Sequence, residues 1–308
     1  MMNYMSHASK MTGRRLPLVR TLLTVRALLM MSALFVLSSA SAASDLVTPE
    51  RSSSVKTTIE LPLQGVTLEY KANVRLLQVL DDANASLNAN ASSNENASGS
   101  IGYFPLSAQL FDKTNTEANE SNKAIESKKR NVFNQLDAFS VEEPEAKLVK
   151  QQLASFQYLN RVFIELDRNA VISQSDKNPL LVLSSNTNKP SDSQTQVFSL
   201  YLPQRPTSIQ LMGAMKESVT MNLIEHGTLN DYLDALPNSF VGQSADKSVA
   251  YVVQPDGAVQ TIQYAYWNEQ PVYLAPGAIV FMAFYSLPPE YSTLNQDIVD
   301  LLRHKVGL

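Results

Sequence analysis

The side chains that most often carry enzyme chemistry are scarce in this sequence and poorly placed for it. The 308 residues include three histidines and no cysteine, which excludes cysteine nucleophiles and thiolate metal sites. His226 and His304 are far apart in the sequence, and a lone histidine is more typical of a turn or surface than of a general base. The G-x-S-x-G, phosphate-loop and H-E-x-x-H motifs are absent. We therefore expect no metal and no cofactor.

Two pairs of carboxylates have a spacing that could serve acid and base catalysis. Asp231 and Asp234 are three residues apart, as are Asp297 and Asp300. Each pair falls on a predicted helix face that is typical of solvated surface, and neither indicates a specific pair for glycoside cleavage. The sequence thus predicts a protein that is not an enzyme, with a glycan-modifying enzyme as the least favoured alternative.

Aromatic residues offer a different chemistry, which is stacking on the face of a sugar ring. Tyr264, Tyr266 and Trp267 form one such group, and Tyr103 and Phe104 before Pro105 form another. Residues of this kind also cover sheet edges, so stacking and simple packing both remain open for each group.

The N-terminus has the pattern of an export signal over residues 1–42. This stretch carries five basic residues and no acidic one, followed by an apolar run from Ala27 to Leu37. The run is shorter than the about 20 residues that a spanning helix needs. Ala40-Ser41-Ala42 then fits the A-x-A pattern of a cleavage site. We expect an exported, periplasmic protein of a Gram-negative bacterium.

Composition limits the partners. The chain is 44% hydrophobic and 18% charged, which is typical of a globular protein. Removal of residues 1–42 leaves 20 basic against 29 acidic residues, a net charge of −9. An acidic protein is a poor partner for nucleic acid, since phosphate binding needs a basic face.

Between residues 43 and 205 the patterns predict strands around a helical segment. Strands are predicted at Val55–Leu63, Val66–Tyr70, Arg161–Asp167 and Gln196–Leu202. A short helix is expected from Asn73 to Leu80, and a flexible insertion rich in asparagine, alanine and serine over 83–100. Residues 116–159 have two apolar stripes at helical spacing, which predicts a helical hairpin that must pack on something else.

Residues 206–286 form a second α+β unit. A capped helix is predicted at Thr228–Leu233. Strands are predicted at Ser208–Met215, Val219–Ile224, Val249–Val253, Val259–Tyr264 and Ala278–Phe284. The turn Pro255-Asp256-Gly257 predicts a hairpin between the third and fourth of these strands.

This second unit resembles the SLBB module, a β-grasp found in polysaccharide-export and soluble-ligand-binding proteins. The resemblance is carried by Ile209–Met215, by His226–Leu233, and by Val253–Gly257 with its P-D-G turn. His226–Leu233 stands where the family has a G-x-T-L-x-x-x-L helix, although here Thr228 directly follows Gly227.

A wider stretch, from Val55 to Val306, resembles the GfcC/YjbG family of capsule and exopolysaccharide biosynthesis proteins. The motifs that carry this are Arg161–Asp167, Gln204–Pro206, Tyr266–Asn268, Leu287–Tyr291 and Leu294–Val299. The resemblance implies an α+β fold with two β-grasp domains, the helical hairpin inserted in the first, and a C-terminal amphipathic helix over 287–308.

The resemblance also implies a site and a role. An arginine at the position of Arg161 lies in a pocket of the first domain in this family, so Arg161 is the candidate ligand contact, with Tyr103 and Phe104 beside it. Its guanidinium suits a sugar carboxylate or a phosphate; a structural ion pair is the alternative. The expected function is a non-enzymatic accessory protein of capsule or exopolysaccharide export that binds glycan or a protein of the export machinery.

The C-terminal helix has three possible uses. Leu294, Ile298, Leu301 and Leu302 lie on one face of it. They can pack on their own domain, dock on a partner protein, or join an oligomeric conduit at the outer membrane, which would be the only membrane contact. A monomer is expected in preference to an oligomer.

Overall fold

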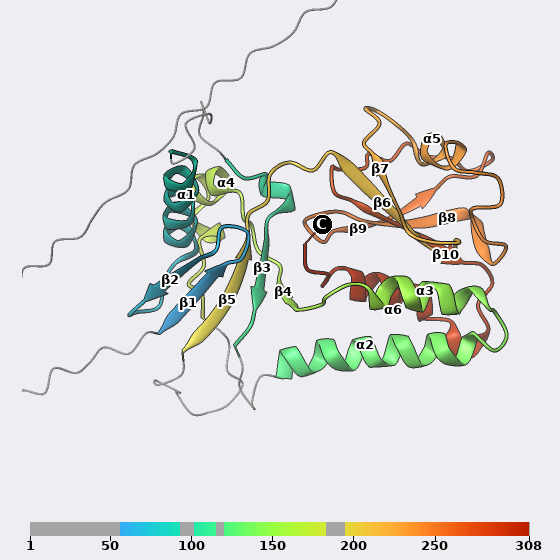
Figure 1. Ribbon diagram of the computed structural model, residues 1–308, viewed down its shortest axis with the longest axis horizontal. Helices are drawn as coiled ribbons and strands as arrows, with labels where there is room; N and C mark the ends of the chain where they lie inside the picture. The colour runs from blue at the N-terminus through green and yellow to red at the C-terminus, as the bar shows by residue number, and fades with distance from the viewer. Residues whose placement is uncertain (1–55, 93–101, 115–119, 183–194, 308) are drawn as a thin grey trace, which may run out of the picture. The chain divides into compact units, whose positions relative to one another are not determined.

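The computed structural model describes residues 56–92, 102–114, 120–182 and 195–307. Residues 52–308 form one compact unit, and residues 1–51 are a separate unit that lies outside the described residues. The predicted export signal over 1–42 therefore falls outside them too. The described chain holds two five-stranded sheets and several helices, which confirms a mixed α+β fold (Figure 1).

The first sheet has the strand order β2-β1-β5-β3-β4. In that order the strands are Val66–Tyr70, Thr57–Leu61, Gln196–Tyr201, Gln109–Asp112 and Asn160–Val162. β1 and β2 form an antiparallel hairpin, β1 runs parallel to β5, and β3 is antiparallel to both β5 and β4. The parallel pair at the centre joins the start of the unit to a strand far along the chain.

The second sheet repeats this topology with the order β7-β6-β10-β8-β9. In that order the strands are Val219–Asn222, Ser208–Gly213, Ile279–Phe284, Ala245–Val253 and Val259–Gln263. Again an outer antiparallel hairpin, β6 with β7, precedes a parallel central pair, β6 with β10, and two antiparallel pairings follow. A helix follows the first hairpin of each sheet along the chain, so the two sheets have the same arrangement of strands and helix.

Helices α1 (Leu76–Ser92) and α4 (Arg168–Ser173) pack on the first sheet (Figure 1). Val79, Leu80 and Ala83 of α1 are fully buried in this core. The insertion predicted as flexible over 83–100 therefore begins inside a helix, because its alanines favour helix and Ala83 faces the sheet. Residues 93–100 lie outside the described part.

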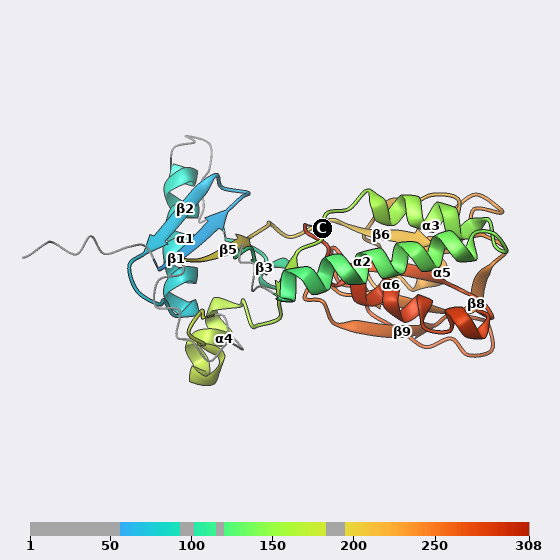
Figure 2. The same ribbon diagram turned by 90° about the horizontal axis from the view of Figure 1, so that it is seen from below.

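The second sheet is covered on both faces, which accounts for β10, all of whose residues are buried. Helix α5 (Leu229–Asp234) packs on one face, with Tyr232 at the centre of that core. Helices α2 (Glu120–Phe139), α3 (Glu145–Ala154) and α6 (Leu294–Leu302) share a core with the other face (Figure 2). The helical hairpin that interrupts the first sheet thus packs on the second one.

One buried glutamine fixes the hairpin in place. Gln152 of α3 accepts the Gly213 N–H at 2.9 Å and donates to the main-chain oxygens of Gly213 and Met215 at 3.1 and 3.3 Å. Gly213 has a φ of +113°, and a Cβ there would lie 2.3 Å from the Met282 oxygen. A glycine is therefore required at the end of β6, and the Gln152 side chain forms hydrogen bonds with its N–H and its oxygen.

Two segments depart from the sequence pattern. The strand predicted over Arg161–Asp167 ends at Val162, and its predicted last residue, Asp167, is instead the N-cap of helix α4, where it accepts the Asn169 N–H at 2.9 Å. Strand β3 and helix α4 were not predicted; every residue of β3 is buried, so it has no alternation to detect. Short 3-10 helices occur at Pro105–Ser107, Ser175–Lys177 and Pro289–Tyr291.

The apolar face of α6 is internal, which favours packing on its own domain over docking on a partner protein or joining a conduit at the membrane. Leu294, Ile298, Leu301 and Leu302 are buried among residues of α2 and the second sheet. Packing on their own domain therefore leaves these side chains no surface for a partner protein or a membrane. Helix α6 has nine residues, about 14 Å of length. Among the described residues, no helix has the length and apolar character needed to cross a bilayer.

Candidate functional site

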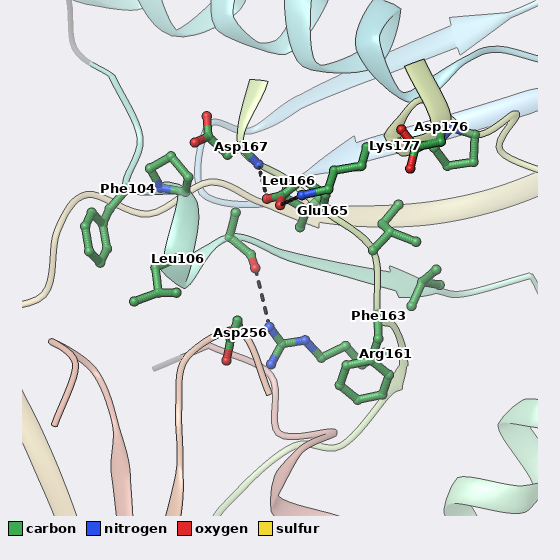
Figure 3. A pocket seen from close by; sticks show the side chains of 15 residues that line it. Phe104, Leu106, Arg161, Phe163, Glu165, Leu166, Asp167, Asp176, Lys177 and Asp256 are labelled. Atoms are coloured by element: carbon green, nitrogen blue, oxygen red, sulfur yellow. Dashed lines mark hydrogen bonds and ion pairs between the residues drawn. The ribbon is translucent and has the colours of Figure 1, made fainter. Parts of the chain in front are cut away.

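A cavity of about 960 Å³ lies beside β4, the edge strand of the first sheet (Figure 3). It lies where β4 ends, next to the 3-10 turn before β3. The walls come from four places in the sequence: Phe104–Leu106 with Ala108, the stretch Arg161–Asp167, the turn with Asp176, Lys177 and Pro179, and Asp256 from the β8–β9 turn.

Two phenyl rings contribute to the apolar surface of the cavity, together with aliphatic side chains such as Leu106 and Ile164. Phe104 precedes the turn at Pro105–Ser107, and the guanidinium of Arg205 lies over its ring, 5.4 Å from the centroid. Phe163, just after β4, is 44% exposed. Half-exposed rings beside polar groups suit a ligand with apolar C–H faces and hydroxyl edges.

Arg161 lies in the wall of the cavity, but part of its guanidinium is already bound. It is buried, and its Nη2 donates to the main-chain oxygens of Pro255 at 2.6 Å and Ala108 at 3.4 Å. Burial lowers the pKa of Arg161 to about 10, with the charge of Asp256 opposing that shift and the charge of Arg303 adding to it. The group stays protonated at neutral pH and acts as a structural link as well as part of the wall.

The β8–β9 turn is held against β4 by a second arginine. Arg303, after α6, donates from Nε to the Gly257 oxygen at 2.8 Å, and its guanidinium lies over the Phe163 ring at 4.6 Å. Gly257 has a φ of +86°, and a Cβ there would lie 2.5 Å from Cε1 of Phe163. Arg161, Arg303 and Phe163 together form what we call the hairpin clamp.

His304 contacts two members of the hairpin clamp, Arg161 and Phe163. Its Nδ1 accepts the Arg161 N–H at 3.2 Å, and its ring meets Phe163 edge-on at 5.5 Å. Burial, together with the positive charges of Lys128, Arg303 and Arg161, lowers the pKa of His304 to about 4. The imidazole is therefore neutral at pH 7, as an acceptor at Nδ1 must be.

The polar side of the cavity is rich in carboxylates. Glu165 pairs with Lys177 at 3.0 Å, and its pKa is lowered by the Asp167 N–H bond, with Lys177 contributing further. Asp167 caps α4 through Asn169. Asp256 accepts the Ala258 N–H at 2.8 Å, and Asp176 lies on the exposed turn. Four carboxylates face two cations in this lining.

The structure separates the residues that the sequence singled out. Phe104 and Arg161 line the cavity, whereas Tyr103 lies behind it. The Tyr103 hydroxyl donates to the Leu166 oxygen at 2.7 Å and accepts the Arg168 N–H at 3.3 Å. Burial raises the pKa of Tyr103 to about 12. Tyr103 therefore has a structural role, since its hydroxyl fixes the backbone between β4 and α4 by hydrogen bonds.

Tyr266 and Trp267 lie on the loop after β9 and are not among the residues of the cavity. They are 96% and 74% exposed. Their neighbour Tyr264 is buried, with its hydroxyl bonded to the Asp246 oxygen. The aromatic group predicted from the sequence is thus divided between core and surface.

Sequence reasoning missed two features of the site. Phe163 was placed within a strand, and Asp256 was noted only as a turn residue. The P-D-G turn was the available signal for Asp256, but nothing in it indicates contact with residues nearly a hundred positions earlier. Among the described residues, no group of histidine, aspartate and glutamate side chains has the arrangement of a metal site.

Two comparisons with known proteins agree with the motifs. Residues 217–307 match the family described as "Capsule biosynthesis GfcC C-terminal". The chain is also 26% identical over 162 residues to the uncharacterized protein YjbG of Escherichia coli (strain K12). That alignment covers 51% of this chain and 59% of YjbG, so the chain matches less than two thirds of its relative. These matches confirm the resemblance to the GfcC/YjbG-like capsule biosynthesis family.

Proposed function

From this family resemblance we propose that the protein is a non-enzymatic, periplasmic accessory protein of capsule or exopolysaccharide biosynthesis that binds glycan. The observation that carries the proposal is the cavity of about 960 Å³ beside β4, with Phe104 and Phe163 in its walls. The family relates the chain to capsule biosynthesis; the cavity supplies a place for the polymer.

The size and lining of the cavity support a saccharide ligand. Its volume is at the upper end of the range of about 300 to 1,000 Å³ for ligand pockets. Phenyl rings stack on the C–H faces of sugars, and the carboxylates, Lys177 and main-chain groups can bond to hydroxyls. One wall with rings and another with polar groups suits a segment of sugar chain better than a wholly apolar molecule.

The geometry offers little support for catalysis at this site. His304, the histidine beside the clamp, is neutral and uses Nδ1 to accept the Arg161 N–H. Glu165 is paired with Lys177, and Asp167 caps a helix. Groups committed to structural bonds are poor general acids or bases, so we favour binding without turnover.

The finer description of the fold is also part of the proposal. The shared strand order of the two sheets, each with a helix after its first hairpin, supports two β-grasp units, the second of SLBB type. The basic and apolar pattern of residues 1–42 supports export to the periplasm. We do not extend the proposal to an oligomeric conduit, because the apolar face of α6 is buried.

Calorimetric titration of the purified protein with surface polysaccharide from the producing cells tests the proposal. We expect binding to the wild type and an affinity about three- to tenfold lower for Phe104→Ala, the loss of one stacking contact. Trp267→Ala is the matched control, since Trp267 is exposed and lies away from the residues of the cavity. The proposed glycan binding at the cavity would be overturned if the wild type did not bind, or if only Trp267→Ala lost affinity for the polysaccharide. Capture of an export-machinery protein that depends on Phe104 would point to a protein ligand.

A further inference from the structure

The charges in the cavity wall bear on which sugars it can accept. Among the lining residues, Glu165, Asp167, Asp176 and Asp256 oppose Arg161 and Lys177, a formal balance of −2 at neutral pH. This differs from the positive site expected from the sequence, where Arg161 was to bind a sugar carboxylate or phosphate. Two more cations, Arg205 and Arg303, lie over the Phe104 and Phe163 rings, so the carboxylates act locally, where they are exposed. An anionic sugar that approaches Asp176 or Asp256 meets a like charge.

Both cations of the lining are already engaged. Lys177 donates to Glu165 at 3.0 Å, and Nη2 of Arg161 is shared between two main-chain oxygens. An anionic ligand would therefore compete with bonds that hold the protein together. By contrast, within the described residues neither Asp176 nor Asp256 is in an ion pair. Both side chains are exposed at the cavity.

The hairpin clamp holds Asp256 at the wall of the cavity. Arg161 holds the residue before it, at the Pro255 oxygen, and Arg303 holds the residue after it, at the Gly257 oxygen. Pro255 and Gly257 are buried while Asp256 between them is exposed. The two arginines bind backbone oxygens, so the carboxylate of Asp256 stands beside the cavity next to Arg161 (Figure 3).

We propose that this cavity selects neutral or amino sugars over uronic acids, and that Asp256, placed by the hairpin clamp, and Asp176 set that selection. The inference rests on the proposed glycan binding and adds the class of sugar. Neutral units fill the cavity through stacking and hydroxyl bonds alone. Ammonium groups gain attraction from the two carboxylates, and uronate groups meet them as like charges.

Three trisaccharides of matched length serve as probes: tri-glucosamine, tri-N-acetylglucosamine and tri-galacturonate. At low ionic strength we expect tri-galacturonate to bind about tenfold or more weakly than tri-N-acetylglucosamine, and tri-glucosamine to bind at least as tightly as the latter. Added salt should weaken tri-glucosamine binding and leave the neutral probe unchanged.

Asparagine variants test which residues make the selection. Asp256→Asn and Asp176→Asn keep the side-chain shape. Each should reduce the gap, which is the ratio of the affinity for tri-glucosamine to that for tri-galacturonate, about three- to tenfold. Asp234→Asn on α5 is the matched control, since it removes one exposed carboxylate outside the cavity and should leave the gap unchanged.

The role of the clamp is tested by combining substitutions. Arg303→Lys keeps the positive charge but loses the Nε bond to the Gly257 oxygen, so it should reduce the affinity ratio between tri-glucosamine and tri-galacturonate by releasing the turn that carries Asp256. In the Asp256→Asn protein, the same Arg303→Lys change should have no further effect on this ratio. A merely structural role for Arg303 would instead lower the affinity for all three probes equally in both backgrounds.

The outcomes separate the two proposals. If none of the probes and no surface polysaccharide binds, the proposed glycan binding itself fails. If the polysaccharide or the neutral probe binds and tri-galacturonate binds as tightly or more tightly, only the selection fails. A gap that is the same in Asp256→Asn, Asp176→Asn and Asp234→Asn also overturns it.

Discussion

Arg161 donates a hydrogen bond from Nη2 to the main-chain oxygen of Pro255 at 2.6 Å, across 94 positions of sequence. The bond joins β4 of the first sheet to the β8–β9 turn of the second, at the cavity that we propose as a glycan site. Side chains from both sheets therefore line the cavity, and its shape depends on contacts that no local pattern encodes.

Arg161→Met should lower the free energy of unfolding by about 2 to 4 kcal/mol, since it removes charged hydrogen bonds from buried carbonyls. Chemical denaturation followed by circular dichroism measures the effect. Arg168→Met is the control: Arg168 pairs with Asp81 at a half-exposed position, so its loss should cost less than about 1 kcal/mol. Equal losses in the two variants would contradict a linking role for Arg161.

Gly257→Ala should destabilise the protein by about 2 to 4 kcal/mol, through backbone strain and contact with the Phe163 ring. Gly65→Ala is matched, because Gly65 also has a positive φ, +66°, but has nothing within 4 Å of an added Cβ. Gly65→Ala should therefore show only the strain, about 1 kcal/mol. Pairing Gly257→Ala with Phe163→Leu should recover part of the loss, and a failure to do so would argue against close contact.

Gln152→Leu should cost about 1 to 3 kcal/mol, because it leaves the buried N–H of Gly213 without its partner, whereas the Gly213 oxygen still accepts the Met215 N–H at 2.7 Å. The adjacent Gln151 is exposed on the same helix, so Gln151→Leu should change stability by less than about 0.5 kcal/mol. Thermal unfolding of both variants measures the difference. Similar melting temperatures would mean that α3 does not depend on this bond for its place on the second sheet.

His304 should make stability depend on pH between 6.5 and 4. Its pKa is about 4 in the folded protein and the ordinary 6.5 when unfolded. In that window the unfolded state binds the proton and the folded state does not, so stability falls as the pH falls. After allowance for its partial exposure, the loss should be about 1 to 2 kcal/mol.

The measurement is the free energy of unfolding at pH 7 and pH 4.5 for the wild type and for His304→Asn, which keeps an acceptor but does not titrate. The difference between the two pH values should be smaller in the variant by that amount. The same pH dependence in both proteins would show that burial and the charges of Lys128, Arg303 and Arg161 do not hold His304 neutral.

Much of the fold was predictable from the sequence because its elements carry local signals. The hairpin at Pro255–Gly257 and the helix capped by Thr228 and Asp231 both appear where turn and capping chemistry placed them. The helices of 116–159 followed from their apolar stripes. Strand β3 has no such signal, since it is buried at every position, and the end of β4 depends on the cap at Asp167.

The site was less predictable, for a physical reason. Arg161 was identified through the resemblance to the GfcC/YjbG family and Phe104 as an aromatic residue suited to stacking, and both line the cavity. The hairpin clamp of Arg161, Phe163 and Arg303 meets Gly257 only when the helical hairpin and α6 pack on the second sheet. Of the charged residues in the lining, only Asp256 comes from a distant part of the sequence, while the resemblance drew attention to Arg161 and not to the carboxylates that follow it.

Amide hydrogen exchange with and without the surface polysaccharide of the producing cells tests the central claim most directly. We predict slower exchange on binding in three segments that line the cavity, 104–108, 162–167 and 255–258, with the loop 265–274 unchanged. Protection confined to that loop, which carries Tyr266 and Trp267, or no protection anywhere, would contradict the assignment of the cavity as the glycan site.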